Sequence, residues 1–171
     1  RRLAEYKLKQ SYSQLENNLD EMVRAMSLTV EERDPYTAGH QRRTTELAVA
    51  LAREMGLSEH QCKGLRMAGL IHDMGKIAIP AEILSKPGGL NTVEFQLIQR
   101  HPQVGYDILK QFEFPGAVDR IVLQHHERLN GSAFDGYAQL DDTESPEVLV
   151  IAVIGGVGDV AAAAFDRAVR L

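Results

Sequence analysis

The first part of the chain carries apolar residues at heptad spacing. The intervals between them are four, three, four, three and four residues, along Leu8, Tyr12, Leu15, Leu19, Met22 and Met26. This period predicts a long helix whose apolar stripe pairs with a second helix as a coiled coil. The alternative is an amphipathic helix that packs on its own domain. Because Pro35 ends the pattern, we expect residues 1–33 to form a dimerising signalling helix and residues 34–171 to form the main domain.

Apolar residues three and four positions apart continue along the rest of the chain and predict further helices. Gly56 and Gly75 are expected to end two of them, while Ser58 with Gln61 and Asn91 are expected to cap the starts of two others. The expected helices cover about 38–55, 58–74, 91–101, 104–112, 117–129 and 147 onward, with loops over 77–89 and 131–142. No strand-like alternation appears, so the predicted fold class is all-α.

Composition narrows the functional classes only modestly. The chain has 171 residues, of which 44% are hydrophobic and 25% charged, as expected for one globular domain with a helical extension. A net charge of -5 without a basic block argues against nucleic acid as a partner. No apolar run is long enough to predict a membrane span, and the single cysteine, Cys62, favours a cytoplasmic location. Because the chain begins with Arg, we expect an upstream domain.

An adjacent histidine and aspartate, His72 and Asp73, close an apolar run that ends in Leu70 and Ile71. Burying an imidazole beside a carboxylate costs several kcal/mol unless another group compensates both. A divalent metal ion would do so. Lys76 follows about one turn later, where its ammonium could meet a phosphate bound to that metal.

The histidines as a set strengthen the metal hypothesis. Of the six in the chain, His60 is expected to face solvent, and the others occupy helix ends or buried faces: His40, His72, His101, His125 and His126. Core packing or capping would explain any one of them alone. Together with Asp73 they favour a shared site, and imidazole and carboxylate ligands without thiolates suit Fe, Mn or Zn. Two metals bridged by one carboxylate would use all of these ligands.

Five segments resemble the HD-GYP branch of the HD phosphohydrolase superfamily. They are DPYTAGH at 34–40, HDMGKIAIP at 72–80, ILSKPG at 83–88, RHPQVG at 100–105 and HHER at 125–128. The resemblance implies an HD-type helical bundle that hydrolyses the bacterial messenger cyclic di-GMP at a centre of two or three metals, often iron or manganese. It also implies fusion to a sensory or receiver domain within a two-component system, with diguanylate cyclases as further partners.

Carried over by position, the resemblance implies that the five histidines other than His60 are metal ligands, with Asp73 as the bridge between metals. Lys76 corresponds to the phosphate-facing lysine of the family. The resemblance also implies that members with three metals place an extra carboxylate shortly before the first histidine, and the residue four positions before His40 is Tyr36. This favours two metals.

The chain departs from the family after Ser132. The Gly-Tyr-Pro segment becomes residues 133–135 in strict register or, after a three-residue insertion, residues 136–138, and either way the proline is lost. Ser132 and Tyr137 are expected to contact substrate. Strict spacing places the last ligand of the family at Ile154, and the substitute we expect is Asp159.

The main functional hypothesis is therefore a metal-dependent cyclic di-GMP phosphodiesterase. One alternative is a catalytically weak or inactive module that binds metal or a cyclic dinucleotide and signals through partners, which the altered Gly-Tyr-Pro segment favours. A second is another HD phosphohydrolase, acting on a mononucleotide or on a different cyclic dinucleotide.

Overall fold

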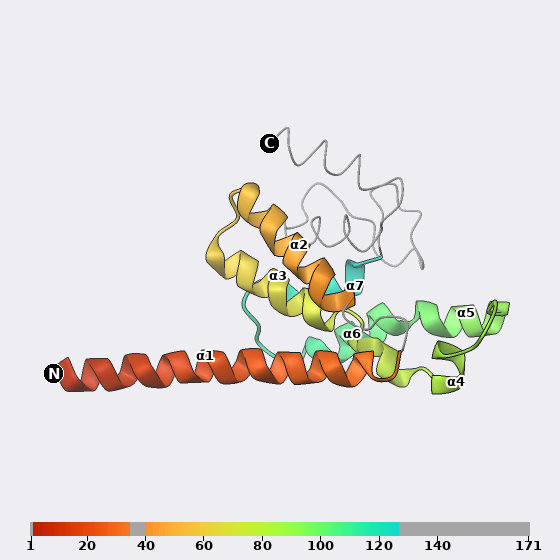
Figure 1. Ribbon diagram of the computed structural model, residues 1–171, viewed down its shortest axis with the longest axis horizontal. Helices are drawn as coiled ribbons and strands as arrows, with labels where there is room; N and C mark the ends of the chain where they lie inside the picture. The colour runs from red at the N-terminus through yellow and green to blue at the C-terminus, as the bar shows by residue number, and fades with distance from the viewer. Residues whose placement is uncertain (1, 35–39, 127–171) are drawn as a thin grey trace.

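The computed structural model describes residues 2–34 and 40–126, and this part of the chain is helical with no strand. The expectation of an all-α fold is therefore confirmed (Figure 1). In chain order the elements are α1 (Arg2–Glu31), α2 (His40–Glu54), α3 (Glu59–Ile71), the 3-10 helix η1 (Met74–Ala78), α4 (Ala81–Leu84), α5 (Thr92–Gln99), α6 (His101–Leu109) and α7 (Val118–Gln124).

Helix α3 forms the centre of the core. It packs against α1, α2 and α7, and its residues Leu65, Met67 and Ile71 are almost completely buried. Cys62 is a buried free thiol in the same helix, whereas His60 in its first turn is exposed, as expected from the sequence. Helix α3 also positions the candidate site, because the His-Asp pair follows directly after its last residue, Ile71.

The predicted caps are present. Gly56 has a φ of +79°, which a residue with a side chain rarely adopts, and it follows the end of α2. Ser58 accepts from the backbone N–H of Gln61 while the Gln61 side chain accepts from the backbone N–H of Ser58, which completes the capping box of α3. A second box, between Asn91 and Glu94, opens α5.

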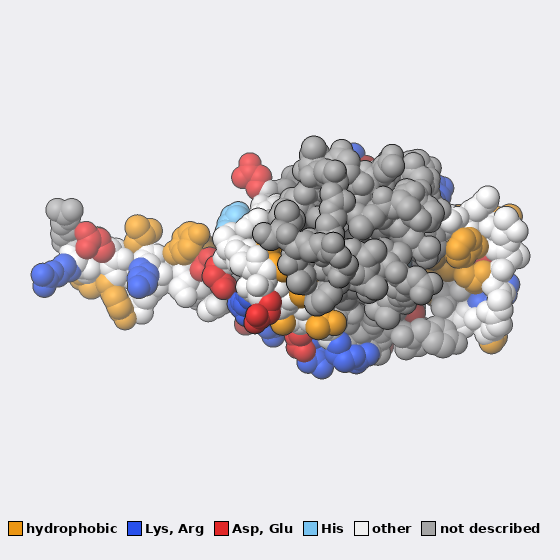
Figure 2. Space-filling model, turned by 90° about the horizontal axis from the view of Figure 1, so that it is seen from above, with side chains coloured by type: hydrophobic (Ala, Val, Ile, Leu, Met, Phe, Trp, Pro, Cys, Tyr) orange, Lys and Arg blue, Asp and Glu red, His pale blue; other side chains and the backbone are white. Residues whose placement is uncertain are grey.

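Helix α1 contacts the domain through a stripe of residues that largely differs from the predicted heptad stripe. We call that predicted stripe the seam; its residues are Leu8, Tyr12, Leu15, Leu19, Met22 and Met26. Val23, Ser27 and Val30 are buried, and Leu19 is partly buried against the core. The other seam residues are exposed, from Met26 at 42% to Leu8 at 72%. Figure 1 shows the N-terminal half of α1 extending beyond the other described helices, and Figure 2 shows hydrophobic side chains along it. The second half of α1 thus packs on the helical core, and the division at residue 33 stays a prediction.

Several predicted boundaries shift in the structure. Helix α3 ends at Ile71, so the His-Asp pair lies in the following turn, and Gly75 is not the residue that ends the helix. The expected loop over 77–89 contains the end of η1 and the short helix α4. The expected helix over 104–112 instead covers His101–Leu109, since Pro102 occupies its first turn and favours helix initiation there.

The tandem histidines were expected within a helix, and this expectation is wrong. Helix α7 ends at Gln124, and both His125 and His126 lie in the turn that follows. The expected loop over 131–142 and the helix from 147 onward lie outside the described residues.

Gly75 is required by close packing rather than by helix termination. A Cβ atom at this position would lie 1.8 Å from the backbone oxygen of His101 and 2.7 Å from the backbone nitrogen of Gly105. These are backbone atoms of α6, which cannot move aside as a flexible side chain could. The glycine therefore allows η1 to lie directly against the helix that carries His101.

We expect Gly75→Ala to separate η1 from α6. Overpacking of this kind costs about 1–3 kcal/mol, and the melting temperature of the domain should fall by several degrees. Gly89→Ala is the matched control, because a Cβ there meets no atom within 4 Å and its φ is not positive. Equal melting temperatures for the two variants would contradict the packing argument.

Candidate metal centre

Three helix ends bring histidines to one place. His72 follows the end of α3, His125 follows the end of α7, and His101 lies at the junction of α5 and α6. In each, the ring Nδ1–H donates to the backbone carbonyl three residues earlier at 2.7 Å; the acceptors are Gly69, Ile98 and Val122. Carbonyls in the last turn of a helix lack an intrahelical donor, so each histidine satisfies one. In the neutral form of each ring, a proton held on Nδ1 leaves the Nε2 lone pair free.

The free Nε2 atoms converge on Asp73, which is only 4% exposed. Its Oδ1 lies 3.3 Å from His101 Nε2 and 4.0 Å from His125 Nε2, and its Oδ2 lies 3.6 Å from His72 Nε2. The Nε2 atoms of His101 and His125 are only 3.1 Å apart. If both carry lone pairs they repel, unless a cation lies between them. Two imidazoles on one metal, with bonds of about 2.0–2.1 Å, are separated by a similar distance.

His126 extends this cluster. Its ring centroid lies 4.2 Å from that of His125 and 5.1 Å from that of His101. Two groups of possible ligands result, His101 with His125 and His126, and His72 with Asp73 and His125, and the ligand atoms within each group lie within 4.8 Å of one another. The cluster can therefore hold a divalent metal ion, and His125 belongs to both groups.

The electrostatic environment keeps these groups in their metal-binding forms. Burial raises the pKa of the Asp73 carboxyl, but His72, His101 and Lys76 together lower it well below its usual range. Burial lowers the pKa of His125 well below its usual value, and His126 acts in the same direction. Burial and His101 lower the pKa of His126 to about 3. Near neutral pH the aspartate is ionised and these two imidazoles are neutral, as metal ligation requires.

These shifts predict how the metal-free protein responds to acid. A histidine whose pKa falls from 6.5 to about 3 on folding binds its proton preferentially in the unfolded state. Stability is therefore complete above about pH 6.5 and is lost as the pH falls, by up to about 1.4 kcal/mol per pH unit for each such histidine. The stabilisation by Asp73, whose pKa is depressed below 3.8, is lost only at lower pH.

We therefore expect the melting temperature of the chelator-treated protein to drop between pH 7 and pH 5, measured by circular dichroism. His126→Gln should make this dependence shallower, because the glutamine does not titrate whereas His125 still does. His60→Gln removes an exposed histidine and should leave the profile unchanged. A wild-type profile that is flat over this range would contradict the burial of neutral imidazoles.

Lys76 lies between two carboxylates. Its Nζ is 2.9 Å from Asp73 Oδ2 and 2.9 Å from Asp34 Oδ2. Burial lowers the pKa of the lysine, but the two aspartates outweigh it and raise the pKa above its usual value. Asp34 was not among the site residues that the sequence predicted. Asp34 opens the DPYTAGH motif, but its pairing with Lys76 joins residues 42 positions apart, which no local pattern predicts.

Arg33, the residue before Asp34, is bonded to the η1 segment. Its guanidinium donates to the backbone oxygens of Ile77 at 2.5 Å and Ile79 at 3.1 Å. Arg33 and Asp34 follow directly after α1, so the end of this helix is bonded both to the η1 segment and to Lys76. The position of η1 beside the histidine cluster thus depends on α1 as well as on α6.

The predicted site residues divide into two sets. The structure brings together His72, Asp73, Lys76, His101, His125 and His126. His40 is the first residue of α2, but its side chain lies outside the described part, as do Ser132, Tyr137 and Asp159. The metal-binding, catalytic and substrate-binding roles of the residues in both sets stay predictions.

The fold and the site define a helical domain with a buried His-Asp centre suited to a divalent cation. A sequence model of the HD domain matches residues 24–144, and the chain therefore belongs to the HD domain family. This confirms the family resemblance that the motifs indicated. The match begins within α1, in the half of the helix that packs on the core.

Curated relatives give more detail. The chain is 37% identical over 132 residues to the cyclic di-GMP phosphodiesterase response regulator RpfG of Xanthomonas campestris, covering 76% of this chain and 35% of that protein. It is 36% identical to a cyclic di-GMP phosphodiesterase of Thermotoga maritima, covering 77% and 36%. It is 38% identical to the 3'3'-cGAMP-specific phosphodiesterase 1 of Vibrio cholerae, covering 64% and 25%. The chain thus spans a quarter to about a third of the length of these relatives.

Among the described helices, none combines the length and the apolar character that a membrane crossing needs.

Proposed function

We propose that this domain is a metal-dependent phosphodiesterase that hydrolyses cyclic di-GMP. The observation that carries the proposal is the convergence of three Nε2 atoms on the buried Asp73 carboxylate, with the Lys76 ammonium 2.9 Å from the same carboxylate. Phosphate esters are substrates that such a combination of metal ligands and a cation can bind. The names of the relatives, cyclic di-GMP phosphodiesterases among them, support this choice of substrate.

We infer that the centre holds two divalent metals, iron or manganese. The two oxygens of Asp73 face different histidines, Oδ2 toward His72 and Oδ1 toward His101 and His125, as a bridging carboxylate would require. When bound, such metals activate water and stabilise charge on the phosphate. The absence of thiolate from the described cluster is compatible with either ion. His40 and Asp159 would complete the ligand set.

The protein itself contributes positioning and charge. The carbonyl bonds at Nδ1 fix the orientation of His72, His101 and His125 before any ligand binds, which avoids reorganisation during the reaction. Lys76, whose side chain is 14% exposed, would turn its ammonium toward the non-bridging oxygens of the phosphate. Ser132 and Tyr137 would contribute to the wall that binds the rest of the substrate.

A second cyclic dinucleotide, 3'3'-cGAMP, should be tested in parallel. The identity to a 3'3'-cGAMP-specific phosphodiesterase, 38%, is close to the identities to the cyclic di-GMP phosphodiesterases of Xanthomonas campestris and Thermotoga maritima, 37% and 36%. The metal ligands contact phosphate and do not distinguish guanine from adenine. The base would therefore be selected by residues away from the cluster.

The decisive experiment combines metal analysis with turnover. The protein is purified without oxygen, its iron and manganese are quantified, and both cyclic dinucleotides are supplied with and without a chelator. We expect about two metals per chain, conversion of cyclic di-GMP, and loss of activity on chelation. Bound metals with neither substrate converted would favour the alternative of a binding module. No stoichiometric metal would contradict the proposed centre itself.

We also propose that the domain works as a homodimer, below an upstream sensory or receiver domain. The exposed apolar side chains of α1, among them Leu8, Leu15 and Met22, form a surface that a second copy of the helix could bury. A response regulator among the relatives is in line with an upstream domain of this kind. A cytoplasmic location would suit Cys62, which is a free, buried thiol.

The dimer has its own test. We expect Leu8→Asn with Leu15→Asn to weaken self-association, since each buried leucine lost costs roughly 1.5–3 kcal/mol. Leu19 is left unchanged because it also packs against the core of its own domain. Leu47→Asn, at a leucine that is 62% exposed on α2, is the control. Analytical ultracentrifugation that finds the same dimer affinity in the α1 variant would place the interface elsewhere.

A further inference from the structure

A second pocket lies away from the metal centre, between α1, α2 and α3. Its volume is about 440 Å³, within the range of small-molecule sites, and none of its lining residues is a candidate metal ligand. Both α1 and α2 pack on α3, and residues from all three helices line the pocket. At its edge Ser27 of α1 donates to the side-chain oxygen of Gln41 of α2 at 2.6 Å, a buried hydrogen bond that holds the two walls together.

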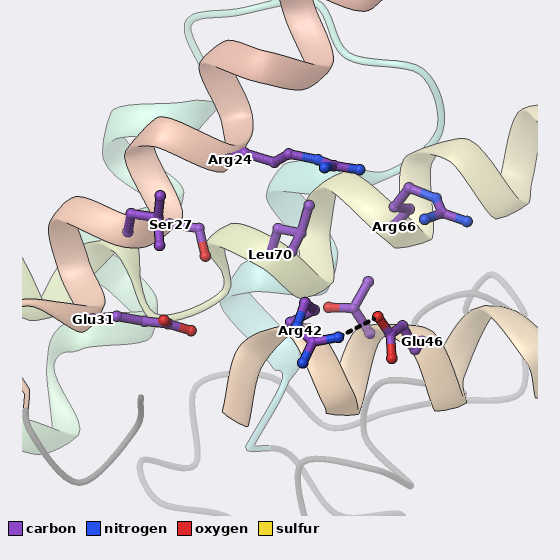
Figure 3. A pocket seen from close by; sticks show the side chains of 9 residues that line it. Arg24, Ser27, Glu31, Arg42, Glu46, Arg66 and Leu70 are labelled. Carbon is purple, nitrogen blue, oxygen red and sulfur yellow. Dashed lines mark hydrogen bonds and ion pairs between the residues drawn. The ribbon is translucent and has the colours of Figure 1, made fainter. Parts of the chain in front are cut away.

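Each of the three helices contributes an arginine to this pocket: Arg24 from α1, Arg42 from α2 and Arg66 from α3. In Figure 3, Arg42 is bonded to Glu46 on one side, while Arg24 and Arg66 extend from the other two helices. Three lining arginines at one pocket contrast with the net charge of -5 of the chain, in which basic side chains are outnumbered by acidic ones.

The charges in the pocket are not balanced. Arg42 pairs with Glu46 at 2.9 Å, and Glu31 has an interaction of its own. Within residues 2–34 and 40–126, neither Arg24 nor Arg66 has an ion pair or a hydrogen bond through its guanidinium. Each guanidinium presents five N–H donors in a planar fork that matches phosphate oxygens. An anion placed between them would satisfy both cations.

Beside these cations the pocket has apolar walls. Leu28 of α1 and Leu70 of α3 line it together with Arg24 and Arg66. Inorganic phosphate would leave these leucines in contact with water, whereas an organic phosphate could cover them. The lining therefore fits a molecule that combines a phosphate group with a less polar body.

We propose that this pocket binds a phosphorylated small organic molecule, with its phosphate held by Arg24 and Arg66 and its organic part against Leu28 and Leu70. Such a ligand would bridge α1 and α3. The proposal does not depend on the activity of the metal centre, because no residue is shared between the two sites.

Calorimetric titration of the full chain with GMP, with and without prior removal of metals, tests this site. We expect a binding event tighter than about 1 mM that survives chelation, and weaker binding of inorganic phosphate. Loss of the event on chelation would assign it to the metal centre and overturn the proposal. Phosphate that binds as tightly as GMP would overturn the role of the leucines.

Substitution gives the sharper comparison. Arg24→Gln with Arg66→Gln should weaken GMP binding at least about tenfold, because two charge-assisted contacts are lost. Arg53→Gln, which removes the same charge from α2 outside this pocket, should leave the affinity unchanged. If the double variant does not fold, each single variant is measured and each should bind more weakly. Unchanged affinity in folded variants would overturn the proposal.

Discussion

Asp73→Asn should abolish both metal binding and phosphodiesterase activity. The carboxylate is the only anionic group that faces the Nε2 atoms of His72, His101 and His125 within the described part of the chain, at 3.6, 3.3 and 4.0 Å. Without it, the centre has no carboxylate beside these imidazoles, and the Lys76 ammonium repels a divalent cation. We expect turnover to fall on the order of 10³-fold or more, since metal ions supply several kcal/mol of charge stabilisation.

The fold should survive this change. Asparagine has nearly the same volume as aspartate, and Lys76 retains its ion pair with Asp34 at 2.9 Å. Metal content by mass spectrometry and helix content by circular dichroism separate the two effects. Asp107→Asn, which removes an exposed carboxylate paired with Lys110, is the control. A folded Asp73→Asn protein that keeps its full metal content would mean that the His-Asp pair is structural.

Lys76→Met should separate metal binding from catalysis. The ammonium lies 2.9 Å from Asp73 in the absence of substrate, so its removal takes a positive charge away from the centre, and divalent cations should bind at least as tightly. Turnover should nevertheless fall about 10²–10³-fold, because a charge stabiliser of the phosphate is lost. The loss should appear in kcat more than in KM, if the lysine acts mainly on the transition state.

Lys76→Met should also lower the stability of the fold, and this effect must be measured together with turnover. Asp34 loses its bond to Lys76, and the loss of this charged partner by a buried carboxylate lowers the stability of the fold. The melting temperature reports that effect independently of activity. Lys86→Met removes a lysine that pairs with Glu94 at 2.6 Å, outside the cluster, and serves as the control. Metal loss in Lys76→Met would show that the lysine organises the centre, and the role proposed for it would be wrong.

Local rules predicted the helical elements and several of their ends. The capping boxes at Ser58 and Asn91 and the turn at Gly56 involve residues within a few positions of each other, so the sequence alone was enough. The end of α3 was misplaced because Gly75 is also the kind of residue that ends helices. Its actual contact, with the backbone of His101, joins separate segments and is not visible in a local pattern.

The coiled-coil seam is a second case in which a local pattern did not predict a contact between separate segments. Heptad spacing identified α1 as a helix with an apolar stripe, but Val23, Ser27 and Val30 face the core, and Leu19 is the seam residue that packs against it. A spacing of three and four residues describes either stripe, and only the packing of α1 on α3 distinguishes them. The seam residues exposed in the single chain remain the surface for the proposed dimer.

By itself the sequence determined the fold class, the family motifs and the identities of the histidines, the aspartate Asp73 and the lysine that meet at the centre, because residue type and local spacing carry this information. Only the tertiary structure decided how those residues meet. It placed three Nδ1 atoms against helix-end carbonyls, aimed their Nε2 atoms at Asp73, and brought Asp34 to Lys76. Such contacts join separate helices, and their geometry follows from the packing of α1, α6 and α7 around α3 and η1, which no short stretch of sequence specifies.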